Sequence, residues 1–350
     1  MTARHSLSAA AALGTALIAA ATAHAENPAD FYRGKTIEFA IAGAPAGGYD
    51  VAARILANHM SRHIPGNPVI IVRNMPGAAG LIVTNYLYNV AKRDGTTIGM
   101  PTSNVPLEPR LKLLSPDGSN VKFDLSQFAW IGTPLQEPQV TWLWHTAPAA
   151  NVDDLKTNEV LMGATTASAD NAILPLLADQ LIGTKMKVLT GYQGQNEINL
   201  AAERGEVQGN NTGLSNLTVN KADWLREQKV RIVLQYGRER LAQLPDVPTV
   251  IELTRSEDDR AALRFYTVKF SMARPILIPP DVPAERVTAL QKAFEATMTD
   301  PLYLEEAQRI GLDTNWLGAK ALADQARAIA ETPQAVVDHL HGLLAGAGVK

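Results

Sequence analysis

The chain has 350 residues, a formal net charge of −3 and no cysteine. The nearly neutral charge argues against a nucleic-acid partner, and the lack of cysteine excludes disulfides and a lipid-bearing cysteine. A chain of this length without disulfide bonds must depend on a sizeable core, and its length is typical of two domains.

The first 25 residues have the pattern of a secretory signal peptide. Arg4 and His5 precede an apolar, alanine-rich stretch that closes on the small-residue pattern Ala23-His24-Ala25. This stretch consists mostly of Ala, Gly and Thr, whereas a membrane anchor needs about twenty strongly apolar residues. We therefore expect residues 1–25 to be cleaved and the mature protein to lie in the periplasm.

From Lys35 onward, short apolar segments alternate with helical patterns such as those of residues 50–64 and 78–93. Near-continuous apolar runs predict parallel strands that are buried on both faces, and the intervening segments predict helices on both faces of the sheets. The predicted strands are IEFAIAG, VIIVRN, TTIGM, FAWIG, VTWLWH, VLMGA, MKVLTG, VRIVLQYG and FYTVKFSM, in that order.

The composition shifts at two places, near residues 115–127 and 238–260, where Pro and charged residues cluster. We interpret these as linkers or crossings between domains. The predicted first domain comprises residues 26–131 plus 265–350, and the second, inserted domain comprises residues 132–264.

The segment GAPAGGYD, residues 43–50, lies between a predicted strand and a helix expected from about Val51. Gly47 and Gly48 allow backbone N–H groups to approach a ligand, and the helix start adds unpaired N–H groups, which together form an anion cradle. The spacing fits neither a dinucleotide nor a phosphate loop. A tight turn without a ligand is the alternative; for Asp50 we favour a helix cap that also orders a water molecule.

Two further strand ends carry small or polar residues. RNMPGAAG follows the second predicted strand, and GMPTSN ends the third with Ser103 and Asn104. Ligands bind at the carboxyl edge of such sheets, so these turns predict a cleft there.

Five segments in this order, IEFAIAGAPAGGYDVAARILANHM, VIIVRNMPGAAG, RDGTTIGM, LPDVPTVIEL and ILIPPDVPAERVTALQKAF, resemble the extracytoplasmic receptors of tripartite tricarboxylate transporters, also called the Bug family. The resemblance implies an α/β periplasmic binding protein of type II, a Venus flytrap with two mostly parallel sheets. It implies a monomer that captures a small organic carboxylate between its domains and delivers it to membrane subunits, without cofactor, metal or catalysis.

The resemblance also implies which loops hold the ligand, largely through main-chain groups. The chain departs from the family at Ala46, where a third glycine is common, and at Tyr49, where a small hydroxylic residue is frequent. A ring at the mouth of the site would favour an aromatic or longer acid through stacking. The expected ligand-binding residues are Ala44, Pro45, Ala46, Gly47, Gly48, Tyr49, Asp50, Thr102, Ser103, Asn104, Thr165, Thr166, Ser168, Tyr192, Gln193 and Gly194.

Other patterns were weighed against this function. His59 and His63 have the spacing of a zinc pair, but they share the apolar side of their helix, which favours packing. Trp142 and Trp144 are expected in a packed strand rather than in an aromatic wall of the cleft. The chain has neither G-x-S-x-G nor HExxH, so an exported hydrolase is a lesser alternative; a sensor that presents its ligand to a two-component system is the other.

Overall fold

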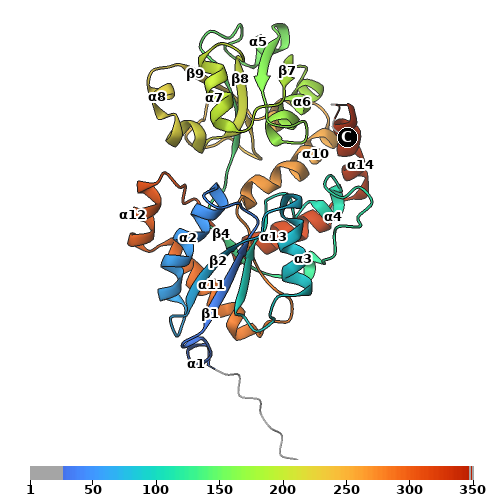
Figure 1. Ribbon diagram of the computed structural model, residues 1–350. Helices are drawn as coiled ribbons and strands as arrows, with labels where there is room; N and C mark the ends of the chain where they lie inside the picture. Colours follow the sequence, from blue (N-terminus) through green and yellow to red (C-terminus); the bar gives the residue numbers. More distant parts are fainter. Residues whose placement is uncertain (1–26, 347, 349–350) are drawn as a thin grey trace, which may run out of the picture.

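The computed structural model describes residues 27–346 and 348, and it shows two α/β lobes, each built on its own sheet (Figure 1). The predicted signal peptide, residues 1–25, lies outside the described residues. We use lobe 1 for the six-stranded sheet with its helices and lobe 2 for the five-stranded sheet with its helices. Among the described helices, none is both long and apolar enough to cross a membrane.

Lobe 1 has a mixed sheet in which β1 lies between two parallel neighbours. β2 and β3 pair with β1 in parallel, whereas β10, β4 and β11 add antiparallel pairs. The order across the sheet is β11 (Leu317–Gly318), β4 (Ala129–Thr133), β10 (Ile276–Ile278), β3 (Thr97–Met100), β1 (Thr36–Ile41) and β2 (Val69–Asn74).

Helices cover both faces of this sheet because β1 is apolar on both sides. Ile37, Phe39 and Ile41 point to one core and Ala40 to another, as the two-residue period of a strand requires. The first face packs against α2 (Gly48–Met60), α11 (Ala284–Met298) and α12 (Pro301–Arg309). The second face packs against α3 (Leu81–Asn89) and α13 (Ala319–Ala330). The remaining helices of lobe 1 are α1 (Pro28–Tyr32) and α4 (Glu108–Leu111).

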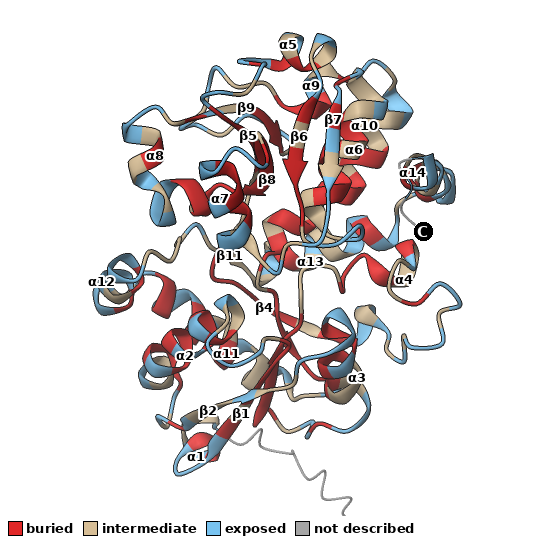
Figure 2. Cartoon of the chain, turned by 45° about the horizontal axis from the view of Figure 1, so that its top comes forward, coloured by how far each residue is buried: buried red, intermediate tan, exposed pale blue. Residues whose placement is uncertain are grey.

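Lobe 2 also has a mixed sheet. β6 pairs in parallel with β7 and β8, and β5 pairs antiparallel with β8 and β9. The strand order is β7 (Met186–Leu189), β6 (Val160–Gly163), β8 (Gly209–Gly213), β5 (Gln139–Trp144) and β9 (Val230–Tyr236). Its helices are α5 (Val152–Thr157), α6 (Asp170–Ile182), α7 (Gln195–Glu203), α8 (Ala222–Arg226), α9 (Val250–Leu253) and α10 (Glu257–Thr267). The central strands of both sheets are buried (Figure 2).

The chain passes between the lobes through two short segments. Residues 134–138 lead from β4 to β5, and residues 268–275 lead from α10 to β10. A hydrogen bond from Glu137 N to Phe270 O (2.8 Å) joins the two crossings. Lobe 1 strands come from residues 36–133 and 276–318 and lobe 2 strands from residues 139–236; the domain limits given above stay a prediction.

The last helix, α14 (Gln334–Gly346), contacts elements on both sides of the junction. It lies beside α10 in Figure 1 and packs against α10, α6 and α4. Val337, Leu340 and Leu344 are its buried residues. Arg110 of lobe 1 donates to the carbonyl oxygens of Ala330 and Thr332, which holds the link between α13 and α14.

Three differences from the sequence predictions have physical causes. The segment FYTVKFSM, predicted as a strand, is helical: it forms the end of α10 and the 3₁₀ segment η5 (Val268–Met272). The helix is favoured because Ser256 caps its N-terminus and acidic residues occupy its first turn. Most strands of each sheet run in one direction, as predicted, but β10 and β5 each run antiparallel to both of their neighbours, which the sequence did not predict. β8, with the sequence GNNTG, lacks the apolar run that predicts a strand.

Trp142 and Trp144 belong to a packed core, as predicted. Both are buried on the face of lobe 2 that α7 and α8 cover, and their rings lie 5.5 and 4.9 Å from the ring of Trp224. Trp224 is 1% exposed. This three-ring cluster anchors α8 to the sheet.

Trp224→Ala should lower the free energy of unfolding by about 3–5 kcal/mol, because it leaves a large cavity between two rings that cannot close it. Denaturant unfolding followed by circular dichroism measures the change. Val90→Ala, at a side chain that is 72% exposed, is the control and should stay within about 0.5 kcal/mol of the parent. Equal stability of the two variants would contradict the assignment of this core.

Candidate functional site

The glycine turn forms the first turn of α2. Gly47 is the extended N-cap residue, and the first helical bond, from Val51 N to Gly47 O, is 3.0 Å long. The N–H groups of Gly48, Tyr49 and Asp50 therefore precede the helical hydrogen-bond pattern, and the helix dipole adds partial positive charge there. The turn therefore has the backbone geometry of an open helix N-terminus, and anion binding there stays a prediction.

Asp50 does not cap this helix, so that prediction was wrong. The helix begins three residues earlier than predicted, which places Asp50 inside the first turn, where it is 4% exposed. Its carboxylate accepts hydrogen bonds from Ala46 N (2.9 Å), Asn74 Nδ2 (2.8 Å) and Arg54 Nε (3.0 Å). Asp50 thus holds the loop closed against β2.

Tyr49 also has a different role from the predicted ring at the mouth of the site. Its hydroxyl accepts from Ser103 N (3.3 Å) and donates to Ala273 O (3.1 Å). One face of the ring is covered by the guanidinium of Arg274, 4.1 Å from the ring centroid. Hydroxyl and ring face are therefore engaged within the protein, and stacking of a ligand has no support on this face.

Arg274 is a residue that the sequence analysis missed. Its Nη1 donates to Glu137 Oε2 (3.3 Å) and to Ala273 O (3.0 Å), and an added Cβ on Gly48 would lie 3.5 Å from its Nη2. Burial by itself lowers the pKa of Arg274, but the neighbouring Tyr49 and Glu137 raise it above its ordinary value. A permanent cation thus lies beside the first turn of α2. Its sequence context, ARPILIPP, carries no motif that signals this position.

The loop after β3 lies against the second glycine turn. Thr102 Oγ1 donates to Ala79 O (2.6 Å). Gly80 has a φ of +97°, and a Cβ there would lie 2.9 Å from Thr102 N. Only glycine allows this approach, which fixes the start of residues 102–104.

The predicted loops of lobe 2 are ordered by their own contacts. Thr165 N donates to Asn171 Oδ1 (3.2 Å), and the hydroxyls of Thr166 and Ser168 lie 3.4 Å apart. Gln193 N donates to the carboxylate of Glu197, and Gly194 is the N-cap residue of α7. Half-buried Tyr192 packs on the core of lobe 2, and this burial raises the pKa of its hydroxyl.

Lys269, in the second crossing, joins both lobes through a buried polar cluster. It is 2% exposed, and its Nζ donates to Asp170 Oδ1 (2.5 Å) in lobe 2 and to Asn104 Oδ1 (3.0 Å) in lobe 1. Tyr266 also donates to Asp170 Oδ1 (2.7 Å). Burial lowers the pKa of Lys269, although Asp170 opposes this shift, and burial raises the pKa of Tyr266.

A cavity of about 190 Å³ beside this cluster brings two predicted site residues together. Asn104 comes from lobe 1 and Ser168 from lobe 2, and we call the space the Lys269 cavity. The loop of Tyr192 to Gly194 is not among its lining residues. The full lining consists of Asn104, Leu107, Glu108, Leu111, Leu113, Leu114, Ser168, Tyr266 and Lys269.

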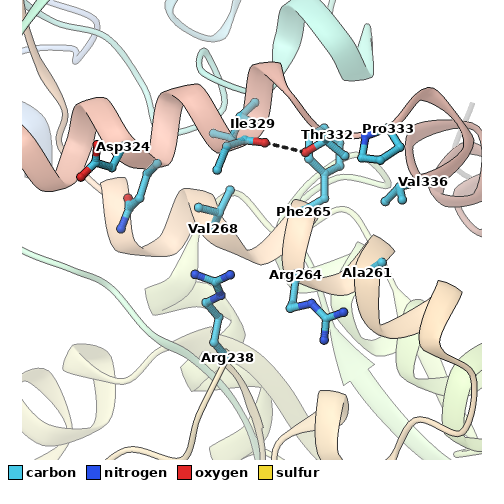
Figure 3. A pocket seen from close by; sticks show the side chains of 12 residues that line it. Arg238, Ala261, Arg264, Phe265, Val268, Asp324, Ile329, Thr332, Pro333 and Val336 are labelled. Carbon is cyan, nitrogen blue, oxygen red and sulfur yellow. Dashed lines mark hydrogen bonds between the residues drawn. The ribbon is translucent and has the colours of Figure 1, made fainter.

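A larger hollow of about 360 Å³ lies elsewhere, between α10 and α13. Figure 3 shows its apolar residues, Val268 and Ile329 among them, with Arg238 pointing toward α10 from lobe 2. None of the predicted ligand-binding residues lines it. We therefore take α2 and the Lys269 cavity as the candidate site, because Asn104 and Ser168 of the predicted residues line this cavity.

His59 and His63 contact carboxylates rather than each other. His59 Nε2 lies 2.5 Å from Glu306 Oε2, and His63 Nε2 lies 2.6 Å from Asp300 Oδ2. Within the described residues, no cluster of three metal-ligating side chains occurs. The pair fastens α2 to α12, in agreement with a packing role.

Asp50→Asn should destabilise the protein in a pH-dependent manner. The bond from Arg54 is the largest cause that lowers the pKa of Asp50, from 3.8 to about 2, while burial opposes it. A lowered folded pKa stabilises the protein above pH 4, and this stability is lost as the pH falls toward 2. We expect a loss of about 1–2 kcal/mol at pH 7, reduced because Arg54 is half-exposed, and none near pH 2. Urea unfolding at several pH values measures the loss of stability, with the exposed Asp30→Asn as the control. A loss that does not change with pH would contradict the role of the Asp50 carboxylate.

Comparisons with known proteins identify the family of this chain. Residues 52–338 match the model of a family described as tripartite tricarboxylate transporter family receptor. The UPF0065 protein in the gbd 5' region of Cupriavidus necator is 25% identical over 337 residues, 94% of each chain, and BugT of Bordetella pertussis is 26% identical over 245 residues, 67% of this chain and 71% of BugT.

Solved structures show the same fold. A TctC solute-binding protein from Polaromonas has a TM-score of 0.67 at 17% identity, covering 88% of this chain and 100% of that one. A protein of R. palustris solved with adipate has a TM-score of 0.59 at 16% identity, covering 90% and 97%. The family is described as a receptor family, and the Polaromonas neighbour as a solute-binding protein. Because the family match covers most of its length, this chain belongs to the receptor family of tripartite tricarboxylate transporters.

Proposed function

We propose that this protein is a periplasmic receptor that captures a small organic carboxylate between its two lobes and delivers it to the membrane subunits of a tripartite tricarboxylate transporter. The signal-peptide pattern of residues 1–25 supports the periplasmic location. Family membership supports the transporter, and the R. palustris neighbour with adipate supports a carboxylate.

The observation that carries the proposal is the position of Arg274 at the first turn of α2. The N–H groups of this turn have no helical partners, and the Nη2 of Arg274 would lie 3.5 Å from a Cβ added at Gly48. Both donor types suit a carboxylate, because hydrogen bonds to ionised groups are about twice as strong as neutral ones. The first crossing, through Glu137, holds the guanidinium in place.

The energetics require both lobes. A micromolar Kd corresponds to about −8 kcal/mol, and each hydrogen bond to a charged group contributes about 1.5–3 kcal/mol. Three N–H groups and one contact with the guanidinium would together reach about this free energy of binding, but only before the entropy lost on association is subtracted. Contacts from lobe 2 must supply the remainder, so tight binding and closure of the lobes occur together.

Isothermal titration of the mature protein with a panel of mono- and dicarboxylic acids tests the proposal. We expect binding of at least one acid together with a smaller radius of gyration in solution scattering. Flat titrations for every acid, or unchanged dimensions with a bound acid, would contradict capture between lobes. Loss of uptake of that acid in a deletion strain separates delivery from presentation to a sensor kinase.

Gly48→Val should abolish binding with little effect on stability. A Cβ on Gly48 would lie at an ordinary van der Waals distance, 3.5 Å, from Arg274 Nη2. We expect the two γ-methyl groups of Val to fill the space above the N–H groups. We expect at least a 100-fold loss of affinity by titration. Gly342→Val is the control, since no atom lies within 4 Å of an added Cβ on that helix. Unchanged affinity in Gly48→Val would show that the loop is only a turn.

Arg274→Met should weaken binding of every acid by roughly 10- to 100-fold, which corresponds to the loss of about one charge-assisted hydrogen bond. Met retains much of the contact with Tyr49 and removes the charge. Arg309→Met, at a side chain that is 71% exposed, is the matched control and should bind normally. If Arg274→Met keeps full affinity, the backbone cradle alone holds the carboxylate.

A further inference from the structure

The Lys269 cavity is lined by both apolar and polar side chains. Its apolar wall consists of Leu107, Leu111, Leu113 and Leu114, and its polar lining includes Asn104, Ser168 and Lys269. Its volume of about 190 Å³ is below the roughly 300–1,000 Å³ of pockets for drug-sized ligands. The space therefore suits one end of a small molecule rather than a whole larger ligand.

The positive charge of Lys269 is compensated within the protein. Asp170 lies 2.5 Å from its Nζ, and the ammonium also lies 4.0 Å from the centroid of the Tyr266 ring. Lys269 is the only cation among the nine residues that line the cavity. The ion pair therefore offers hydrogen-bond donors to a ligand but no net positive charge.

Glu108, which also lines the cavity, adds no positive charge either. It is 2% exposed, and its Oε1 accepts from Leu114 N (2.8 Å) and Ser115 N (2.7 Å). Burial raises the pKa of this carboxyl, while the backbone N–H groups oppose that rise. Glu108 thus fixes the backbone of the leucine wall and is no partner for a second acid.

A carboxylate that entered this cavity would therefore meet no uncompensated cation. Burying an ionised carboxylate is unfavourable unless it is paired, and a second anion beside Asp170 would leave the cluster with net negative charge. A methyl or methylene group against the leucine wall has the opposite effect, because burying apolar surface is favourable. The cavity therefore favours an uncharged group of a ligand over a second carboxylate.

The cavity and the cradle at α2 lie next to each other along one loop. Asn104 lines the cavity, and its neighbour Ser103 donates its N–H to the hydroxyl of Tyr49, the second residue of α2. The loop of Ser103 and Asn104 therefore adjoins both the start of α2, through the Tyr49 side chain, and the Lys269 cavity.

We propose that the ligand is a monocarboxylate whose carboxylate binds at α2 and Arg274 and whose uncharged, apolar end occupies the Lys269 cavity, with Asp170 as the residue that excludes a second carboxylate. This inference rests on the proposed function. It gives the chain a specificity opposite to a receptor for dicarboxylates such as adipate.

Matched pairs of acids test the proposal by isothermal titration of the full mature chain. Hexanoate and adipate share six carbons and differ by one carboxylate, as do butanoate and succinate. We expect the monocarboxylate of at least one pair to bind at least 10-fold more tightly than its partner. Asp170→Asn preserves the size of the side chain, and its amide oxygen can accept hydrogen bonds from Lys269 and Tyr266. It removes the negative charge that compensates the Lys269 ammonium. We therefore expect it to raise the affinity for the dicarboxylate at least 10-fold.

Asp153→Asn is the matched control, because it makes the same charge change at a side chain that is 89% exposed, and it should leave the ratio of the two acids unchanged. Asp170→Ser provides a second variant if Asp170→Asn folds poorly. Equal or tighter binding of the dicarboxylate by the parent protein would overturn the inference while the proposed function stands. An unchanged ratio in both Asp170 variants would also overturn it, and no binding of any acid would defeat the proposed function itself.

Discussion

The stacking of Arg274 on Tyr49 is the contact on which the rest of the site depends. It places a cation beside the first turn of α2 and, through Glu137, connects that turn to both crossings between the lobes. Tyr49 adds a hydrogen bond to Ala273 in the same segment. Under the proposed function, a ligand at the glycine turn would lie close to both crossings, so these contacts would couple its binding to the relative position of the lobes.

The second crossing carries two cations with different surroundings. Arg274 has a partly exposed counter-ion in Glu137, whereas Lys269 has a closer partner in Asp170 and is fully enclosed. A buried pair contributes little net stability but is strongly destabilising when one partner is lost, which favours a role in specificity. The two cations are five residues apart, and under our proposal Arg274 attracts the acid at one end of the site while the Lys269–Asp170 pair disfavours charge at the other.

The sequence predicted the alternation of strands and helices, the glycine turn and the family, because apolar runs and turn residues are local signals. It missed β8, since GNNTG is polar and becomes a strand only between two apolar neighbours. The sequence pattern assigned Asp50 to the helix cap because it placed the start of the helix near Val51. The helix begins at Gly48, so Asp50 lies inside its first turn. Arg274 and Lys269 could not be found, since their roles come from tertiary contacts with residues more than 90 positions away, among them Tyr49, Glu137 and Asp170.

The position of α14 has a mechanical consequence. His341 contacts the carbonyl of Leu111 in lobe 1, and His339 contacts Asp259 on α10, so the C-terminal helix straps the outer side of the junction. Such contacts on one side of a junction favour domain movements whose displacement is largest on the opposite side. If the lobes open and close around a ligand, α14 would therefore limit their separation on its own side.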